Sequence, residues 1–369
     1  MKKIQFINDL NADNVKAIVK NSDGDLLELD LSDENTIDLE NKCYNSVEFV
    51  VSDTQKTSVV YTGAFSIGVE YSKNEGMNKN LTYLFTKDFD STGHVDNYEL
   101  MDTENLAYRD DNSKKISVFV PSTYDGRTPH DILYFFDAQN LFCRAGEYTQ
   151  NGDPYGSWQL DIVISELHRQ FGQNIIVVGI DNADKYRSHE LFMSPDTFGQ
   201  LSPLATVIPD DNFSKGYLDN LSEFMIKTLH PFIKEKYCVS EDNIGIGGAS
   251  MGGIASFYCA LREEGFYKYV LSYSPAYGLY DMSAFENFFA NKDFASKAEI
   301  LPRIHIYCGG GDELEQQLLS SSKAMKSTLV AYGYPADKIF ETYDMEKAHN
   351  EESWRLVLCE SFTKLFGLK

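Results

Sequence analysis

The residues best suited to chemistry lie in the stretch GIGGASMGGIAS, residues 245–256. Gly248, Ser250 and Gly252 fit Gly-x-Ser-x-Gly, a sharp strand-to-helix turn that exposes a serine as a nucleophile. The apolar run NIGIGG precedes Ser250, and apolar residues at helical spacing follow it. This context predicts a catalytic nucleophile; the alternative is a serine that only caps the helix. At the helix start, the Met251 N–H is a candidate donor to an oxyanion.

A nucleophilic serine needs a base, and the base needs a carboxylate that orients it. His349 is the predicted base, because it follows the late strand IFETYD in the polar turn AHNEES. His305 lies inside the run RIHIYC and is predicted to be a core residue. Asp312 follows the end of that run and is the predicted acid, since carboxyl ends of parallel strands face a common crevice. Glu313 is its rival, and Asp312 also suits a helix N-cap.

A second oxyanion donor is expected in the loop after an early strand. The run DILYFF leads into Asp137-Ala138-Gln139-Asn140, and the Gln139 N–H is the candidate, with Asp137 in a structural role.

Aromatic residues offer a candidate substrate wall. Trp158 and Tyr155 in DPYGSWQL and Tyr277 in SYSPAYG suit a sugar or an aryl acyl group, or else ordinary packing. Arg187 and Glu190 in KYRSHEL are expected to form an ion pair with each other that fixes their loop; the alternative is a contact with the substrate.

The elements that must position these residues fall into two parts. From residue 114 onward, short apolar runs alternate with helical patterns, which predicts a doubly wound α/β domain over residues 114–369. Residues 1–105 carry short alternating runs separated by turns, a pattern typical of a β-sandwich. The segment HVDNYELMDTENLAYRDDNSKK, residues 94–115, is polar and charged and is interpreted as the connection between the two parts, with residues 106–113 taken as the linker. Residues 1–112 hold 22 acidic and 10 basic residues, a net charge of 10 − 22 = −12.

Composition and charge disfavour several classes of partner and site. The net charge of −23 disfavours binding to nucleic acid or to anionic membrane surfaces. The six cysteines form no C-x-x-C pair, which indicates neither a zinc site nor a short-range disulfide framework. No run approaches the roughly 18 apolar residues of a membrane span, so a soluble and cytoplasmic protein is expected unless a leader has been removed.

The chain resembles the putative esterase, or esterase D-like, family of α/β-hydrolases. This family includes acetyl-xylan and feruloyl esterases, enterochelin esterase-type enzymes, S-formylglutathione hydrolases and mycolyltransferases. The matching motifs, within residues 114–366, are ISVFVPSTY, LYFFDAQNLF, GSWQLD, IIVVGIDNA, GASMGG and HNEESW. One departure is Ala138, where relatives often have glycine. The amino-terminal part resembles immunoglobulin-like or carbohydrate-binding-like domains.

The resemblance assigns the same site as the residues do. It implies Ser250 as nucleophile, Asp312 as acid and His349 as base, with Met251 and Gln139 N–H as oxyanion donors. It implies no metal or organic cofactor.

The expected function is that of a serine carboxylesterase acting through an acyl-enzyme, on an acylated carbohydrate such as an acetyl or feruloyl ester. A siderophore (enterochelin-type) esterase and an acyltransferase are alternatives. The alternative from another functional class is a carbohydrate-binding protein with an inactive hydrolase fold. The expected partner is a small-molecule or oligosaccharide ester, and a homo-oligomer is possible.

Overall fold

The structure is a computed structural model. It describes short strands within residues 1–92, and it describes the ranges 93–142, 157–182, 186–207 and 215–368. The chain divides into two compact units. One comprises residues 93–142 and 174–349, and the other comprises residues 1–92, 143–173 and 350–369.

The first unit contains a mixed sheet of eight strands in the order β16-β15-β14-β13-β11-β12-β10-β9. The six strands from β11 to β16 are parallel to one another, whereas β10 runs antiparallel to both β12 and β9. The strands are β9 (Gly93–Met101), β10 (Ser113–Pro121), β11 (His130–Phe136), β12 (Ile175–Ile180), β13 (Val239–Ala249), β14 (Tyr269–Tyr273), β15 (Arg303–Gly309) and β16 (Ile339–Asp344). The alternation of strands and helices predicted from residue 114 onward is therefore confirmed as an α/β fold.

Strand β9 differs from the sequence expectation. Its residues were expected to be part of a polar connection, but they pair with β10 from Gly93↔Pro121 to Met101↔Ser113. It is an edge strand whose residues are exposed or half-buried. Strands at the edge of a sheet commonly carry charged side chains, so a polar sequence is compatible with pairing there.

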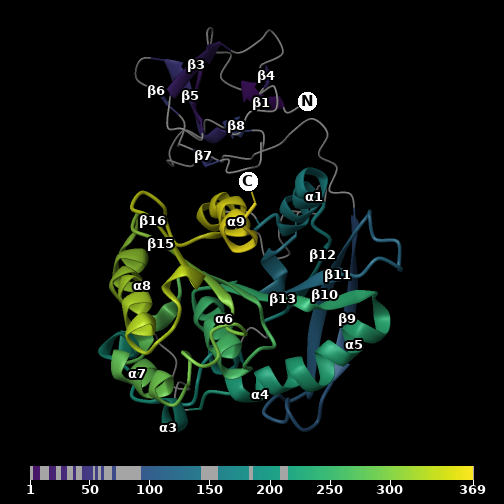
Figure 1. Cartoon of the computed structure of the whole chain (residues 1–369), viewed down its shortest axis with the longest axis vertical. Helices are drawn as coiled ribbons and strands as arrows, with labels where there is room; N and C mark the ends of the chain where they lie inside the picture. The colour runs from purple at the N-terminus through teal and green to yellow at the C-terminus, as the bar shows by residue number, and fades with distance from the viewer. Residues whose placement is uncertain are drawn as a thin grey trace. The chain divides into compact units, whose positions relative to one another are not determined.

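Side chains on both faces of the central strands are buried. Ile132, Tyr134 and Phe136 of β11 belong to a hydrophobic core with helices α4 to α8, which gather on one side of the sheet (Figure 1). Leu133 and Phe135 alternate with them and therefore face the opposite side, where they are fully buried as well. Such two-sided burial explains why these strands read as continuous apolar runs.

The helices of this unit come between the strands. They are α2 (Arg187–Glu190), α3 (Pro195–Phe198), α4 (Leu218–Phe224), α5 (His230–Lys236), α6 (Met251–Arg262), α7 (Met282–Ala290) and α8 (Glu313–Ala331). The 3₁₀ turns are η1 (Ala138–Asn140), η3 (Pro203–Val207), η5 (Ala276–Leu279) and η6 (Ala336–Lys338). A π-helical turn, η4 (Met225–Leu229), joins α4 to α5.

The second unit contains two helices, α1 (Leu160–Phe171) and α9 (Glu351–Phe366), and short amino-terminal strands. The strands are β1 (Lys3–Asn8), β2 (Lys16–Asn21), β3 (Leu26–Asp30), β4 (Thr36–Asp38), β5 (Tyr44–Ser52), β6 (Gln55–Lys56), β7 (Val60–Tyr61) and β8 (Val69–Tyr71). They form two sheets, β4-β1-β8 and β3-β2-β5-β6, with β7 also paired to β5. The short strands agree with the sequence pattern of this region.

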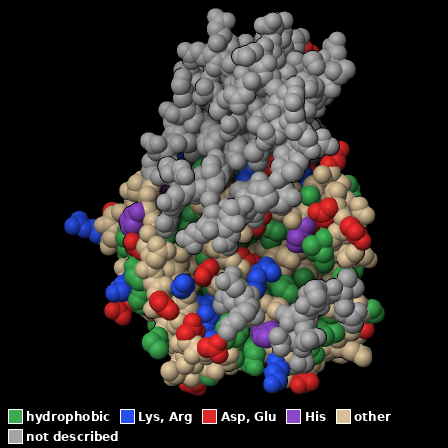
Figure 2. Space-filling view, turned by 180° about the vertical axis from the view of Figure 1, so that it is seen from behind, with side chains coloured by type: hydrophobic (Ala, Val, Ile, Leu, Met, Phe, Trp, Pro, Cys, Tyr) green, Lys and Arg blue, Asp and Glu red, His purple; other side chains and the backbone are tan. Residues whose placement is uncertain are grey.

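The described surface is mixed in character. On the face drawn in Figure 2, acidic and basic side chains lie interspersed among hydrophobic ones. Within the described ranges, no helix combines the length and the apolar character needed to cross a membrane.

Candidate active site

Ser250 stands at a strained turn between β13 and α6. Its backbone has φ 57° and ψ −119°, a conformation that non-glycine residues rarely adopt. The glycines on either side make the turn possible: a Cβ atom on Gly248 would lie 2.7 Å from the backbone of Gly252. Although Ser250 holds the N-cap position of α6, its side chain makes no capping hydrogen bond. The structure thus gives Ser250 the strained strand-to-helix geometry of the motif, and its hydroxyl does not cap the helix.

The backbone of neighbouring segments fixes this turn. The Ser250 N–H donates to the Tyr273 carbonyl at 2.9 Å, at the end of β14, and the Ser250 carbonyl accepts from Ala276 N–H at 3.0 Å. Gly253 lies so close to β14 that an added Cβ would be 2.6 Å from the Tyr273 oxygen. Bonds on both sides of the strained residue supply the constraint that such a conformation requires.

His349 lies in the loop after β16, and its ring contacts a buried carboxylate. Its Nδ1 atom is 3.2 Å from Oε1 of Glu315, which is on the first turn of α8. The Glu315 side chain is fully buried, and that of His349 is 12% exposed. A carboxylate on one ring nitrogen sets the orientation and the tautomer of the imidazole.

Three further donors hold Glu315. Ser274 Oγ donates to Oε1, while Cys308 Sγ at 3.0 Å and Gly309 N–H at 2.9 Å donate to Oε2. Burial alone would raise the pKa of Glu315. The hydrogen bond and charge of His349, with the bonds from Ser274 and Cys308, bring that pKa below its ordinary value. Glu315 is therefore held as a carboxylate anion beside the imidazole.

Asp312 occupies a different place from the one expected of the acid. Its Oδ1 caps α8 by accepting Glu315 N–H at 2.8 Å, and its Oδ2 accepts the backbone N–H of His349 at 2.6 Å. The structure therefore brings Asp312 to the main chain of His349, and Glu315 to its ring. Glu313, the rival for the acid, is exposed.

The glycine run before α8 packs on the loop that carries His349. Gly311 N–H donates to the Lys347 carbonyl at 2.8 Å, and Gly310 N–H donates to the same oxygen at 3.2 Å. A Cβ on Gly309 would lie 2.3 Å from that carbonyl oxygen. The two loops can approach this closely because the glycines have no side chains.

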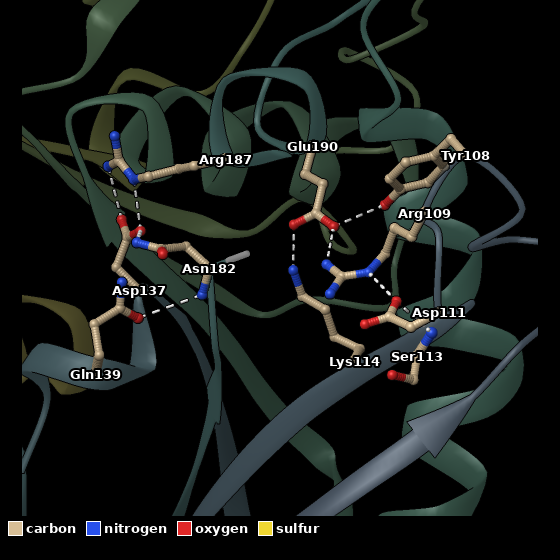
Figure 3. Close-up of polar contacts among 10 residues, drawn as sticks. All are labelled: Tyr108, Arg109, Asp111, Ser113, Lys114, Asp137, Gln139, Asn182, Arg187 and Glu190. Carbon is tan, nitrogen blue, oxygen red and sulfur yellow. Dashed lines mark hydrogen bonds and ion pairs between the residues drawn. The ribbon is translucent and has the colours of Figure 1, made fainter. Parts of the chain in front are cut away.

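Asp137, which packs beside Gly252 on the first turn of α6, anchors a second polar cluster (Figure 3). Asp137 has φ 61° and precedes η1, the turn that contains Gln139. Arg187 binds its carboxylate with two nitrogens, at 2.7 and 2.9 Å, and Asn182 Nδ2 donates to it at 2.8 Å. Asn182 N–H also donates to Gln139 Oε1 at 3.3 Å. Burial alone would raise the pKa of Asp137, but Arg187 and the hydrogen bonds bring it below its ordinary value.

The expected pairing of Arg187 with Glu190 is wrong. Glu190 instead binds Arg109 Nη1 at 2.5 Å and Lys114 Nζ, and it accepts the Tyr108 hydroxyl at 3.2 Å (Figure 3). The side chains of Lys114 and Glu190 are 2% and 1% exposed. Buried charges require close partners. Arg187 and Glu190, at the two ends of α2, find theirs in two separate clusters.

The aromatic residues considered for substrate binding are packing residues where the structure describes them. Trp158 is 2% exposed and stacks on Trp354 with ring centroids 5.2 Å apart. Tyr277 is 1% exposed, and its hydroxyl lies 3.0 Å from Ser272 Oγ. Tyr155 lies outside the described residues. His305 is fully buried, as the sequence predicts for a core residue.

Sequence reasoning missed Glu315, Ser274 and the partner of Asp137. A weak signal existed for Glu315, because it lies three residues after Asp312, the spacing of a capping box. That pattern assigns Glu315 to the helix start, not to a histidine. Ser274 carried no motif; in the structure it has φ 38°, an unusual value for a serine.

Comparison with known proteins identifies a family for this chain. The family described as Putative esterase matches residues 111–365. No curated protein matches the chain in sequence.

Solved structures share the fold at low identity. An IroE-like serine hydrolase from Shewanella oneidensis has a TM-score of 0.55 and 14% identity, over 74% of this chain and 80% of its own. A CE1 ferulic acid esterase from Anaeromyces mucronatus, in complex with ferulic acid, has a TM-score of 0.52 and 18% identity, over 80% and 94%. The enterobactin esterase FES from Shigella flexneri, in the presence of 2,3-di-hydroxy-N-benzoyl-glycine, has a TM-score of 0.52 and 13% identity, over 96% and 89%.

At these identities the likeness shows the fold. The family match spans well over half of the chain, and its segment contains Ser250, Glu315 and His349. The chain is therefore an esterase that belongs to the putative esterase family.

Proposed function

We propose that the protein hydrolyses carboxylic esters through an acyl-enzyme on Ser250, with His349 as base and Glu315 as the carboxylate that orients it. The observation that carries this proposal is the strained turn at Ser250, since its backbone conformation is costly and its hydroxyl does not cap the helix. The buried pair of Glu315 and His349 supports it.

The proposed reaction has two stages. Ser250 Oγ attacks the ester carbonyl while His349 Nε2 takes its proton, and His349 then protonates the departing alkoxide. A water molecule then attacks the acyl carbon while His349 accepts one of its protons. The bond between the acyl carbon and Ser250 Oγ breaks, His349 returns the proton to Oγ, and the acid is released. Glu315 stays ionised throughout and stabilises the imidazolium that forms in each stage.

The negative charge on the carbonyl oxygen needs donors. The N–H groups of Met251 and Gln139 are the proposed pair. Each lies in the first turn of a helix, α6 or η1, where N–H groups have no acceptor within the helix. Donors held in place before the reaction stabilise a developing oxyanion most effectively.

In this proposal Asp312 is not the acid; it positions the His349 loop. Its two carboxylate oxygens accept one N–H from α8 and one from the loop. A residue that uses both oxygens in this way tethers the base to the helix that carries Glu315.

For the substrate, we infer an acylated carbohydrate, with an acetyl or feruloyl group. The likeness to ferulic acid esterases supports this choice. A siderophore ester is the second candidate, because the match to an enterobactin esterase extends over 96% of this chain. Acyl transfer to an alcohol would use the same acyl-enzyme.

Further parts of the proposal concern the rest of the chain. We infer that the amino-terminal strands, within residues 1–92, form an immunoglobulin-like β-sandwich, and their arrangement in two sheets supports this. The sandwich expected over residues 1–105 would then end earlier, because β9 pairs with β10 in the eight-stranded sheet, and residues 93–113 would join residues 114–369 in the catalytic domain. The net charge of −23 supports a protein that binds neither nucleic acid nor membranes, and we infer a cytoplasmic location.

The test is hydrolysis of p-nitrophenyl acetate, p-nitrophenyl butyrate, methyl ferulate, acetylated xylo-oligosaccharide and a catecholate trilactone. Ser250→Ala should lower kcat by at least about 10³-fold, the scale of triad deletions. Ser240→Ala, at the other end of β13, is the matched control. A fluorophosphonate should label Ser250 in the wild type only. Silence on every ester together with no labelling would favour the binding-protein alternative.

A further inference from the structure

We propose that Arg187 is a positioning residue for the oxyanion donors, because its guanidinium joins the turn that carries Gln139 to the start of the helix that carries Met251. This inference rests on the proposed function. It goes beyond the nucleophile, base and acid, since Arg187 takes no part in proton transfer.

The first contact holds a turn that is unfavourable by itself. Asp137 has φ 61° immediately before η1, and a non-glycine residue in this region needs neighbours that impose it. Arg187 Nε and Nη2 bind the two carboxylate oxygens of Asp137 in a fork. Such a bidentate pair fixes direction as well as distance, so it also fixes the N–H groups that follow Asp137.

The second contact reaches the nucleophile helix. Arg187 Nη1 lies 3.7 Å from Met251 Sδ, on the first residue of α6. The Asp137 carboxylate itself packs on the same turn, because a Cβ on Gly252 would lie 3.2 Å from Asp137 Oδ2. One guanidinium therefore touches both segments that supply the proposed donors.

The helix that carries Arg187 is fixed from its other end. Glu190, three residues later, is buried and bound by Lys114 of β10 and by Arg109. Tyr217 N–H also donates to the His189 carbonyl at 2.7 Å. Because α2 is only one turn long, these anchors fix the origin of the Arg187 side chain. Figure 3 shows Arg187 and Glu190 reaching their separate clusters.

The alternative role is direct contact with substrate, since the Arg187 side chain is 32% exposed. The two roles differ in kinetics. A residue that sets the spacing of oxyanion donors acts on the transition state, so its loss lowers kcat. A residue that binds an acidic group of the substrate acts on the ground state as well, so its loss raises KM.

The experiment compares Arg187→Lys, Asp137→Asn and the double variant on p-nitrophenyl acetate, which carries no acidic group. Arg187→Lys keeps the charge and loses the fork. The matched control is Arg262→Lys at the far end of α6, where a partly buried arginine likewise binds several carboxylates, among them Asp219 and Glu223. Melting temperature is measured for every variant, and Ser250→Ala defines the rate without the nucleophile.

We expect Arg187→Lys to lower kcat about 10-fold to 100-fold, less than loss of a whole donor, with KM changed by less than about twofold. The double variant should be no slower than about the slower single variant, because both changes break one interaction. Arg262→Lys should keep wild-type kcat at a similar melting temperature.

An unchanged kcat in Arg187→Lys, a change confined to KM, or additive effects of the two substitutions would overturn the inference while leaving the esterase intact. Failure of the proposed function looks different. In that case the wild type itself would show no hydrolysis that depends on Ser250.

Discussion

His349 Nδ1 lies 3.2 Å from the Oε1 atom of Glu315, a fully buried carboxylate on the first turn of α8. The same helical turn begins with Asp312, which holds the backbone of His349. Two carboxylates three residues apart thus fix one histidine, at its ring and at its main chain. Their separate tasks lead to different expectations for their loss.

Replacing Glu315 should impair catalysis severely. In Glu315→Gln the side chain keeps its length but loses the charge that stabilises the imidazolium, so kcat should fall by about 10³-fold or more. The rate is measured on p-nitrophenyl acetate. Glu313→Gln, an exposed neighbour on the same turn, should retain wild-type kcat. Near-normal turnover in Glu315→Gln would show that another group orients His349.

Replacing Asp312 should affect stability more than chemistry. Asp312→Ala removes the N-cap of α8 and the acceptor of the His349 N–H, so the free energy of unfolding should drop by about 1–3 kcal/mol. Urea denaturation measures the loss. The kcat should decrease less than in Glu315→Gln, because the ring contact remains. If Asp312→Ala were the slower of the two, the roles given to these carboxylates would be reversed.

The lowered pKa of Glu315 links stability to pH. Because its pKa in the folded protein lies below the ordinary value of 4.5, its ionisation stabilises the fold fully above that value. The contribution is lost as the pH falls through the folded-state pKa. Urea unfolding from about pH 6 to about pH 3 should therefore show a steeper loss of stability in the wild type than in Glu315→Gln. Equal pH slopes for the two proteins would refute this linkage, and Glu313→Gln serves as the control.

The buried cluster around Glu190 should be sensitive to loss of its carboxylate. Glu190→Gln leaves Lys114 and Arg109 without their shared anion, so the free energy of unfolding should drop by about 3–5 kcal/mol. Adding Lys114→Met should recover part of the loss, because it removes one of the unpaired charges. Glu223→Gln, at a half-buried surface ion pair with Lys227, should change stability by no more than about 1 kcal/mol. If Glu190→Gln had a similarly small effect, water would be solvating the charges of Lys114 and Arg109 in place of the carboxylate.

Much of the catalytic fold could be predicted from the sequence, because strands buried on both faces produce apolar runs such as those of β11 and β12. The strained turn at Ser250, the proposed nucleophile, could be predicted as well, since this turn needs glycine at Gly248 and Gly252 for steric reasons. Strand β9 could not, because an edge strand with exposed side chains has the composition of a loop.

The proposed acid, Glu315, and the contact of Arg187 with Asp137 could not be predicted from the sequence, for a different reason. Asp312, Glu313 and Glu315 all lie at one helix start, and only the packing of the β16 loop decides which carboxylate meets the ring. Arg187 and Glu190 have the spacing of a helical ion pair. Partners distant in the sequence bind them instead, and no local pattern records such partners.

The backbone of Ser250 also bears on the balance between stability and activity. Glycine accepts a φ of 57° without the penalty that a serine incurs, so a Ser250→Gly chain would fold with less strain at this turn. Selection for stability alone would therefore favour glycine at position 250, and the proposed activity would be lost. The hydroxyl is retained at a thermodynamic cost, so stabilising the protein by replacing its positive-φ residues with glycine would also remove the proposed nucleophile.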